Sequence, residues 1–225
     1  NQLRYLPPEI GQLAQLQTLN VSNNRLEVLP SKISQLSQLR YLFLAGNQLK
    51  SLPPDIGQLI QLQSLDLDKN QLSKLPPAIS QLVLLQCLSL TGNQLKDLLL
   101  KIGKLTRLKY LFLANNQLTV LPSEIGQLSQ LRMLSLSGNH LTALPPEIGQ
   151  LIQLKRLNLQ NNPDLSLPPE FLANYRDAQA IIQVWNDHLV GNFAGQTRLL
   201  REIKLVLVGE GSVVKTSLVN RLLHD

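Results

Sequence analysis

Residues 39–59 read LRYLFLAGNQLKSLPPDIGQL, and this pattern returns every 23 residues along the chain. An asparagine marks its register, at Asn1, Asn24, Asn47, Asn70, Asn93, Asn116, Asn139 and Asn162. A period kept over most of the 225 residues predicts stacked copies of one structural unit. Stacking is required because no single copy can bury its leucines alone.

The spacing of residues inside one unit predicts the path of the chain. Leu42 and Leu44 lie two residues apart, which is the periodicity of a strand with both side chains on one face. Asn47 then turns the chain, and its amide can bond the backbone of adjacent coils, so stacking predicts an asparagine ladder. The segment from Pro53 to Leu59 returns the chain on the far side, either helically or irregularly.

This pattern resembles the leucine-rich repeat family in its 23-residue Leu-Pro-x-x-Ile form, over residues 1–168. The resemblance implies an α/β fold: a right-handed solenoid of about eight repeats, the first one partial, with a parallel sheet on its concave side. The fifth repeat departs from the pattern, since Leu98-Leu99-Leu100-Lys101 replaces the usual Leu-Pro-Pro-Glu-like step. The eighth shifts a leucine at Asn162-Pro163-Asp164-Leu165.

Residues 169–195 have a different periodicity. Apolar residues recur at helical spacing, at Phe171, Leu172, Tyr175, Ala178, Ile181, Ile182, Trp185 and Leu189. We expect a helix here that closes the open end of the leucine core. Residues 191–196 are expected to form a linker.

The strand pattern also predicts which side chains face outward. If Leu42 and Leu44 point inward, Tyr41 and Phe43 point out onto the concave face. The same reasoning gives eight candidate partner-binding residues: Tyr41, Phe43, Asp66, Asp68, Tyr110, Phe112, Met133 and Arg156. We expect a protein or peptide partner, with the aromatics as anchors and the aspartates selecting a basic or polar group.

Two alternatives to partner binding stay open for this face. The matching aromatic pairs, Tyr41/Phe43 and Tyr110/Phe112, also fit simple duplication of a repeat. Alternatively, the C-terminal segment of this chain or a second copy covers the face.

Residues 196–225 change character again. An apolar run over 203–208 meets a glycine-containing turn and then Lys215 and Thr216, the strand–loop–helix context of a phosphate-binding loop. Val214 stands where that motif has its second glycine. A branched side chain there crowds the phosphates and disfavours the backbone conformation that the loop requires.

With repeats before it, this segment resembles the truncated start of a Roc GTPase domain, as found in the Roco family. The resemblance implies that the repeats are the recognition or regulatory arm of a GTP-binding signalling protein. Contacts to GTP or GDP would come from Gly209, Gly211, Lys215 and Thr216, with Thr216 also a Mg²⁺ ligand. We expect no GTP binding or hydrolysis from this fragment, because a nucleotide-binding domain needs a multi-strand sheet.

The resemblance leaves two alternatives to such a regulatory arm. One is a functional GTPase, if the remainder of a Roc domain is present. The other is a stand-alone bacterial leucine-rich-repeat binding protein. Homodimerisation of a longer protein also stays open.

Composition narrows the remaining classes of partner and the case for a membrane span. Charged residues make up 16% of the chain and the net charge is +6, without a basic block interleaved with aromatics, so we expect no nucleic-acid partner. The largest basic group is Lys96, Lys101, Lys104, Arg107 and Lys109. It suggests a solvated face or, as a weaker hypothesis, an acidic partner. No apolar run reaches the roughly 18 residues of a membrane span.

The reactive side chains are few. Cys87 is the only cysteine, which excludes an internal disulfide and fits a reducing, cytoplasmic setting. His140, His188 and His224 match no metal-ligand spacing. No nucleophile–base motif is recognisable, so we assign no catalytic residue.

Overall fold

The computed structural model describes residues 1–165 and 177–193. In the first range each coil contributes a three-residue strand and a five-residue 3-10 helix. The strands are β1 (Thr18–Asn20), β2 (Tyr41–Phe43), β3 (Ser64–Asp66), β4 (Cys87–Ser89), β5 (Tyr110–Phe112), β6 (Met133–Ser135) and β7 (Arg156–Asn158). The 3-10 helices are η1 (Pro8–Gln12), η2 (Ser31–Gln35), η3 (Pro54–Gln58), η4 (Pro77–Gln81), η5 (Leu100–Lys104), η6 (Ser123–Gln127) and η7 (Pro146–Gln150).

One α-helix, α2 (Ala178–Phe193), follows the coils. The chain divides into two compact units, Asn1–Ile181 and Ile182–Asp225, and α2 runs across that boundary. The coils and the first turn of α2 therefore belong to the first unit.

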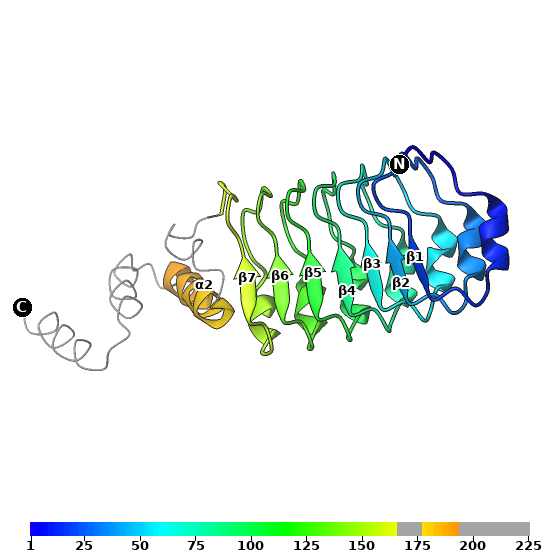
Figure 1. Ribbon diagram of the computed structural model, residues 1–225. Helices are drawn as coiled ribbons and strands as arrows, with labels where there is room; N and C mark the ends of the chain where they lie inside the picture. The colour runs from blue at the N-terminus through cyan, green and yellow to red at the C-terminus, as the bar shows by residue number, and fades with distance from the viewer. Residues whose placement is uncertain (166–176, 194–225) are drawn as a thin grey trace, which may run out of the picture. The chain divides into compact units, whose positions relative to one another are not determined.

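The seven strands form one parallel sheet in the order β1 to β7 (Figure 1). Their register advances by one repeat per strand, so Tyr41 pairs with Ser64 and Ser64 with Cys87. Equivalent positions therefore lie side by side in rows. The central leucine of each strand after the first is fully buried: Leu42, Leu65, Leu88, Leu111, Leu134 and Leu157. The predicted stacked parallel strands are confirmed.

The asparagine ladder is present, and it is buried from Asn47 to Asn162. Leu26 donates its backbone N–H to Asn47 Oδ1 at 2.9 Å. Asn47 Nδ2 in turn donates to the carbonyls of Leu44 in its own coil and Val21 in the preceding one, at 2.9 and 3.1 Å. The same pattern recurs to Asn162, which accepts from Leu141. Each amide thus satisfies backbone groups that would otherwise be unpaired in the core.

The return segments are short 3-10 helices, which settles the choice that the sequence leaves between helical and irregular structure. A proline precedes η3, with φ −64° and ψ 144° at Pro53, and Ile56 of the helix is buried. The fifth repeat keeps this path without proline, because Leu99 adopts φ −57° and ψ 134°. The departure in sequence there does not change the fold.

The residue before each ladder asparagine has a positive φ. Its identity alternates along the chain between a residue with a side chain and glycine: Asn23, Gly46, Lys69, Gly92, Asn115, Gly138 and Asn161. A Cβ atom added at Gly46 would lie 2.5 Å from Asn23 Oδ1. Gly46 and Gly138 thus give room to the asparagine side chain of the coil before them, whereas a Cβ atom at Gly92 would lie 3.6 Å from Lys69, an ordinary contact.

The C-terminal cap is a single helix. In its first turn Ala178 and Ile181 are buried, and Gln179 Nε2 donates to the carbonyls of Leu151 and Leu154 at 3.2 and 3.1 Å. The helix continues through Gly191 to Phe193, so the expectation of a linker from residue 191 is wrong there. A single glycine costs a helix only about 1 kcal/mol and does not end it.

Residues 166–176 and 194–225 lie outside the described residues. The expected phosphate-binding loop, with Gly209, Gly211, Lys215 and Thr216, is in the second of these ranges.

Candidate protein-binding face

The outer face of the sheet carries the rows that strand periodicity predicts. Tyr41 and Tyr110 are each 39% exposed, whereas the leucines beside them, Leu42 and Leu111, are fully buried. Phe43 and Phe112 are half-buried at the other ends of the same strands. The two aromatic pairs therefore lie on the outer surface, on β2 and β5, about 14 Å apart at the usual strand spacing.

Polar side chains occupy the space between the aromatic pairs. Asp66 ends β3, Asp68 follows it, and both are half-buried. Cys87 and Ser89 of β4 lie beside them in register. The face thus has an acidic centre with an aromatic pair on either side.

The Asp66 carboxylate closes a turn at the end of its strand. Its Oδ1 accepts the backbone N–H of Asp68 at 3.0 Å. Asn20 and Asn158 make the same turn in other coils, accepting from Ser22 and Gln160 at 3.0 and 3.1 Å. A neutral amide thus closes this turn as the carboxylate does, and Phe43 and Phe112 hold the same register position without any acceptor, so the turn requires no negative charge.

Asp68 links its own coil to the next one. Its Oδ1 accepts both the Ser89 hydroxyl and the Thr91 backbone N–H, each at 2.6 Å. Within the described part of the chain, the Oδ2 atoms of Asp66 and Asp68 accept no hydrogen bond. Two carboxylate oxygens on this face therefore remain available to a donor.

Burial raises the pKa of Asp66 above its ordinary value, and the charge of Asp68 raises it further, while the hydrogen bond from the Asp68 backbone lowers it. The folded chain thus disfavours the charge on Asp66. A cation placed at this pair would offset that cost.

Burial also raises the pKa of the Cys87 thiol, and the charges of Asp66 and Asp68 act in the same direction, against the hydrogen bond with Ser64. Cys87 is half-buried and free. At neutral pH it is a protonated, weakly nucleophilic thiol, which suits a bystander rather than a reactive group.

The face changes toward β6 and β7. Met133 is half-buried and Arg156 is exposed. Two outward positions are buried, Ala114 at 8% exposure and Ser135 at 9%. The structure therefore places all eight candidate residues on one sheet face, and their role in binding stays a prediction.

Family models match most of the chain. A model described as "Leucine-rich repeat region" matches residues 32–100 and 93–223, and one described as "Leucine rich repeat" matches residues 1–49. The chain belongs to the leucine-rich repeat family. No curated protein matches it.

Solved structures of leucine-rich repeat proteins are similar to the chain. A Leptospira interrogans LRR protein shares 40% identity with a TM-score of 0.71, over 80% of this chain and 45% of its own. The LRR ectodomain of the receptor kinase GASSHO1/SCHENGEN3 from Arabidopsis thaliana shares 41% identity with a TM-score of 0.65, over 69% of this chain and 19% of its own. An internalin of Listeria monocytogenes shares 27% identity with a TM-score of 0.61, over 69% of this chain and 45% of its own. The leucine-rich repeat chain thus spans less than half the length of each of these proteins.

Metal-binding and membrane-spanning features are absent from residues 1–165 and 177–193. These residues contain no cluster of three or more His, Cys, Asp or Glu side chains able to hold a metal ion. None of their helices combines the length and apolar character that a membrane crossing needs. His140, which the sequence places at a turn, is exposed.

Proposed function

We propose that this leucine-rich repeat chain is an interaction module that binds a protein or peptide through the outer, concave face of its sheet. Tyr41 and Phe43 on one side and Tyr110 and Phe112 on the other are the apolar anchors. Asp66 and Asp68, between them, receive a basic side chain of the partner. Met133 and Arg156 extend the face toward the C-terminal coils.

The acid at position 66 is the observation that carries this proposal. Asn20 and Asn158 close the same turn without a charge, so the fold does not require a carboxylate at Asp66. Its pKa is raised, so the charge opposes the folded state at neutral pH. A charge kept at such a position, with free oxygens and aromatic neighbours, is suited to a cationic ligand.

Similar repeat proteins support a peptide or protein as partner. The receptor kinase ectodomain from Arabidopsis thaliana was solved in complex with CASPARIAN STRIP INTEGRITY FACTOR 2. The plant peptide hormone receptor RGFR1 was solved in complex with RGF2, with 28% identity and a TM-score of 0.55 over 69% of this chain and 30% of its own.

Affinity capture with matched variants tests the proposal. One variant changes all four aromatics to alanine, and a second combines Asp66→Asn with Asp68→Asn. Tyr5→Ala and Asp97→Asn are the controls, because Tyr5 is 60% exposed and Asp97 is exposed, and neither lies in a strand. We expect both face variants to lose partners that the controls and the unmodified chain keep; the same partner set in the unmodified chain and all four variants would overturn the proposal.

We further propose that the repeats are the regulatory arm of a Roco-type, cytoplasmic GTP-binding signalling protein. The support is the sequence alone: repeats followed by Gly209, Gly211, Lys215 and Thr216 in the pattern of a phosphate-binding loop, and a single cysteine in the chain. GTP or GDP and Mg²⁺ would belong to the longer protein. Val214 does not fit the glycine position of this motif, so we derive no step through the nucleotide.

Isolation of the native protein tests this second proposal. A Roco-type protein is expected to contain Roc and COR domains and to bind a fluorescent GDP analogue in a manner lost on Lys215→Ala. A native protein without such domains would instead favour a stand-alone repeat protein, an alternative compatible with the similarity to the Leptospira interrogans protein.

A further inference from the structure

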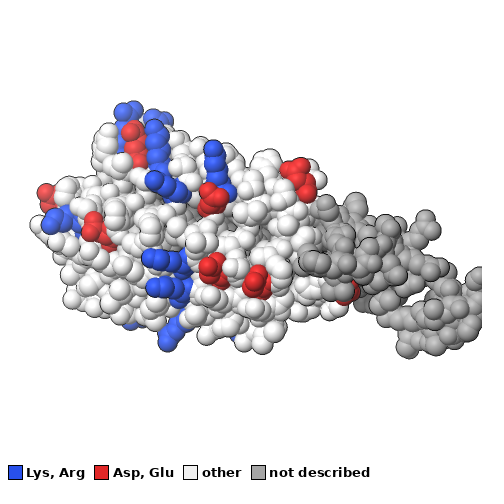
Figure 2. All heavy atoms as spheres, turned by 180° about the vertical axis from the view of Figure 1, so that it is seen from behind, with Lys and Arg blue, Asp and Glu red and all other residues white. Residues whose placement is uncertain are grey.

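The basic residues that cluster in sequence between Lys96 and Lys109 lie in different parts of the fifth coil. Lys101 and Lys104 lie in the 3-10 helix η5. The next 3-10 helix along the chain, η6, carries Glu124. Arg107 and Lys109 lie in the segment before β5. Seen from behind, Lys and Arg form small groups interrupted by Asp and Glu (Figure 2).

The repeat spacing creates a different cationic surface. Lys109, Arg132 and Lys155 each occupy the position directly before a strand, in the three successive coils of β5, β6 and β7. They are neighbours across the stack, since Arg132 N donates to Lys109 O at 2.8 Å and Lys155 N to Arg132 O at 2.9 Å. We call these three residues the cationic row; it spans about 10 Å at the usual strand spacing.

The row is specific to the C-terminal half of the stack. The equivalent positions in the first four coils are Gln17, Arg40, Gln63 and Gln86. Lys109 Nζ donates to Gln86 Oε1 at 3.0 Å. Arg132 and Lys155 are exposed, and their side chains form no ion pair with any residue in the described parts of the chain.

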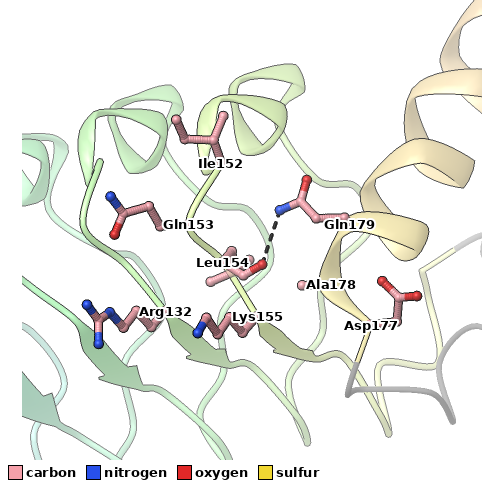
Figure 3. A pocket seen from close by; sticks show the side chains of 8 residues that line it. All are labelled: Arg132, Ile152, Gln153, Leu154, Lys155, Asp177, Ala178 and Gln179. Atoms are coloured by element: carbon pink, nitrogen blue, oxygen red, sulfur yellow. Dashed lines mark hydrogen bonds between the residues drawn. The ribbon is translucent and has the colours of Figure 1, made fainter.

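The row ends in a groove of about 580 Å³ between the last coils and the first turn of α2. Its lining is Arg132, Ile152, Gln153, Leu154, Lys155, Asp177, Ala178 and Gln179. Arg132 and Lys155 project side by side along one side, with Gln179 across the groove (Figure 3). Gln179 is fixed by its hydrogen bonds to Leu151 and Leu154, and Ile152 is 77% exposed.

We propose that the cationic row and this groove bind an acidic, extended peptide segment of a partner protein. The row lies at the strand-start edge of the proposed partner-binding face, since Arg132 and Lys155 directly precede Met133 and Arg156. Two carboxylates three residues apart on an extended peptide lie about 10 Å from each other, which matches the length of the row. The exposed Ile152, across the groove from Arg132 and Lys155, offers an apolar contact to the peptide. The amide of Gln153 offers hydrogen bonds to the peptide backbone.

The lining favours a peptide over a polyanion. Asp177 places a carboxylate in the same groove as the two cations, and it repels a continuous phosphate backbone more than a peptide whose two carboxylates are separated by neutral residues. Among the described residues, the lining contains no aromatic side chain on which a nucleic-acid base could stack.

A fluorescence anisotropy titration tests the proposal with a defined probe. The probe is a fluorescein-labelled peptide with the sequence Gly-Ser-Glu-Leu-Ser-Glu-Ser-Gly, and its control replaces both glutamates with glutamine. We expect the full chain to bind the glutamate peptide and not the control. Arg132→Glu and Lys155→Glu should each weaken binding by about tenfold, and the effect should fall at high salt.

Arg40→Glu is the matched control, because it reverses the same charge at the equivalent position of the second coil. A peptide with lysines in place of the glutamates should bind the Arg132→Glu, Lys155→Glu double variant, which separates lost charge complementarity from misfolding. Ile152→Ser should also weaken the glutamate peptide.

Three results would overturn the proposal: no binding of the glutamate peptide to the unmodified chain, an equal loss with Arg40→Glu, or tighter binding of a labelled single-stranded oligonucleotide or of anionic phospholipid vesicles than of the peptide.

Discussion

Each ladder asparagine from Asn47 to Asn162 satisfies several buried backbone groups at once. Asn93 is 7% exposed; it accepts from Leu72 N and donates to the carbonyls of Leu67 and Leu90. Asn93→Ala leaves these groups unpaired in the core, where each costs about 1–3 kcal/mol. We expect the free energy of unfolding to fall by about 2–4 kcal/mol in urea denaturation.

Gln94→Ala is the matched control for that change, since Gln94 is the next residue and is exposed. It should alter the unfolding free energy by less than about 0.5 kcal/mol. Equal effects of the two substitutions would contradict the energetic role given to the ladder.

Asp66 gives a prediction in which stability and binding change in opposite directions. Its pKa is raised in the folded chain, so its ionisation opposes folding. The stability contributed by the protonated form is present below the unfolded pKa, about 3.8, and is lost as pH rises through the folded value. Asp66→Asn keeps the turn, as Asn20 and Asn158 show, and removes the loss of folding stability that occurs as pH rises.

We therefore expect Asp66→Asn to raise Tm at pH 7 and to leave it unchanged below about pH 3.5, while weakening binding of a basic partner. Thermal denaturation monitored by circular dichroism over about pH 3–8 measures the first effect. A lower Tm for the variant at pH 7 would show that the carboxylate stabilises the unbound fold and would remove the main support for a ligand role.

In the fifth coil, a substitution can restore the proline that precedes 3-10 helices such as η3. Leu99 adopts φ −57° and ψ 134° directly before η5, close to the values of Pro53 before η3. Its backbone N–H donates no hydrogen bond within the described residues. Leu99→Pro restricts the unfolded chain without straining the folded one and should stabilise the protein by about 0.4–1 kcal/mol.

Leu105→Pro is the contrasting change, because Leu105 N donates to Ile102 O at 3.0 Å and a proline there removes that bond. It should destabilise the chain in the same denaturation experiment. A destabilising Leu99→Pro would mean that the fifth coil departs from the path of its neighbours.

The strands can be predicted from the sequence, whereas the form of the return segments and the end of α2 cannot. Two-residue leucine spacing identifies strands such as β2 around Leu42, because burial on one face leaves a periodic record. The sequence does not decide the form of the return segments, since five residues such as Pro54–Gln58 are too few for a helical period to show. It also does not fix the end of α2, because a glycine at 191 is a weak stop signal that the helix overrides.

Along the stack, the coils differ in how well their neighbours cover them. Leu19 of β1 is half-buried, whereas Leu88 of β4 is fully buried, and Leu3, Tyr5 and Leu13 of the first coil are 41%, 60% and 52% exposed. Since a stacked array gains stability from each neighbour, its first coil opens most easily. In hydrogen–deuterium exchange of the 225-residue chain, we expect amides of β1 to exchange faster than those of β4.

Uniform exchange along the stack would contradict that expectation and would show one cooperative unit from the first coil to the last. Repeated measurement with the glutamate peptide bound should slow exchange around Arg132 and Lys155 and leave β1 unchanged.

The aromatic face, formed by Tyr41, Phe43, Tyr110 and Phe112, and the cationic row differ in how well the sequence predicts them. The aromatic face follows from strand alternation around Tyr41 and Phe43, so it is predictable. The cationic row is not, because its members lie 23 residues apart and become neighbours only when the coils stack in register. The local run from Lys96 to Lys109 is the more visible pattern in the sequence, and the fold divides it between η5 and the segment before β5.

The alternation of Asn or Lys with Gly before the ladder asparagines sets a rule for lengthening or shortening the protein. Removing one coil would bring either two glycines or two residues with side chains into adjacent coils. If the coil with Gly46 is removed, Asn23 and Lys69 become neighbours, and the space that Gly46 leaves beside Asn23 Oδ1 is lost. Removing two consecutive coils keeps the alternation intact. Longer or shorter versions of this scaffold should therefore keep a glycine coil directly after the coils that carry Asn23 and Asn115.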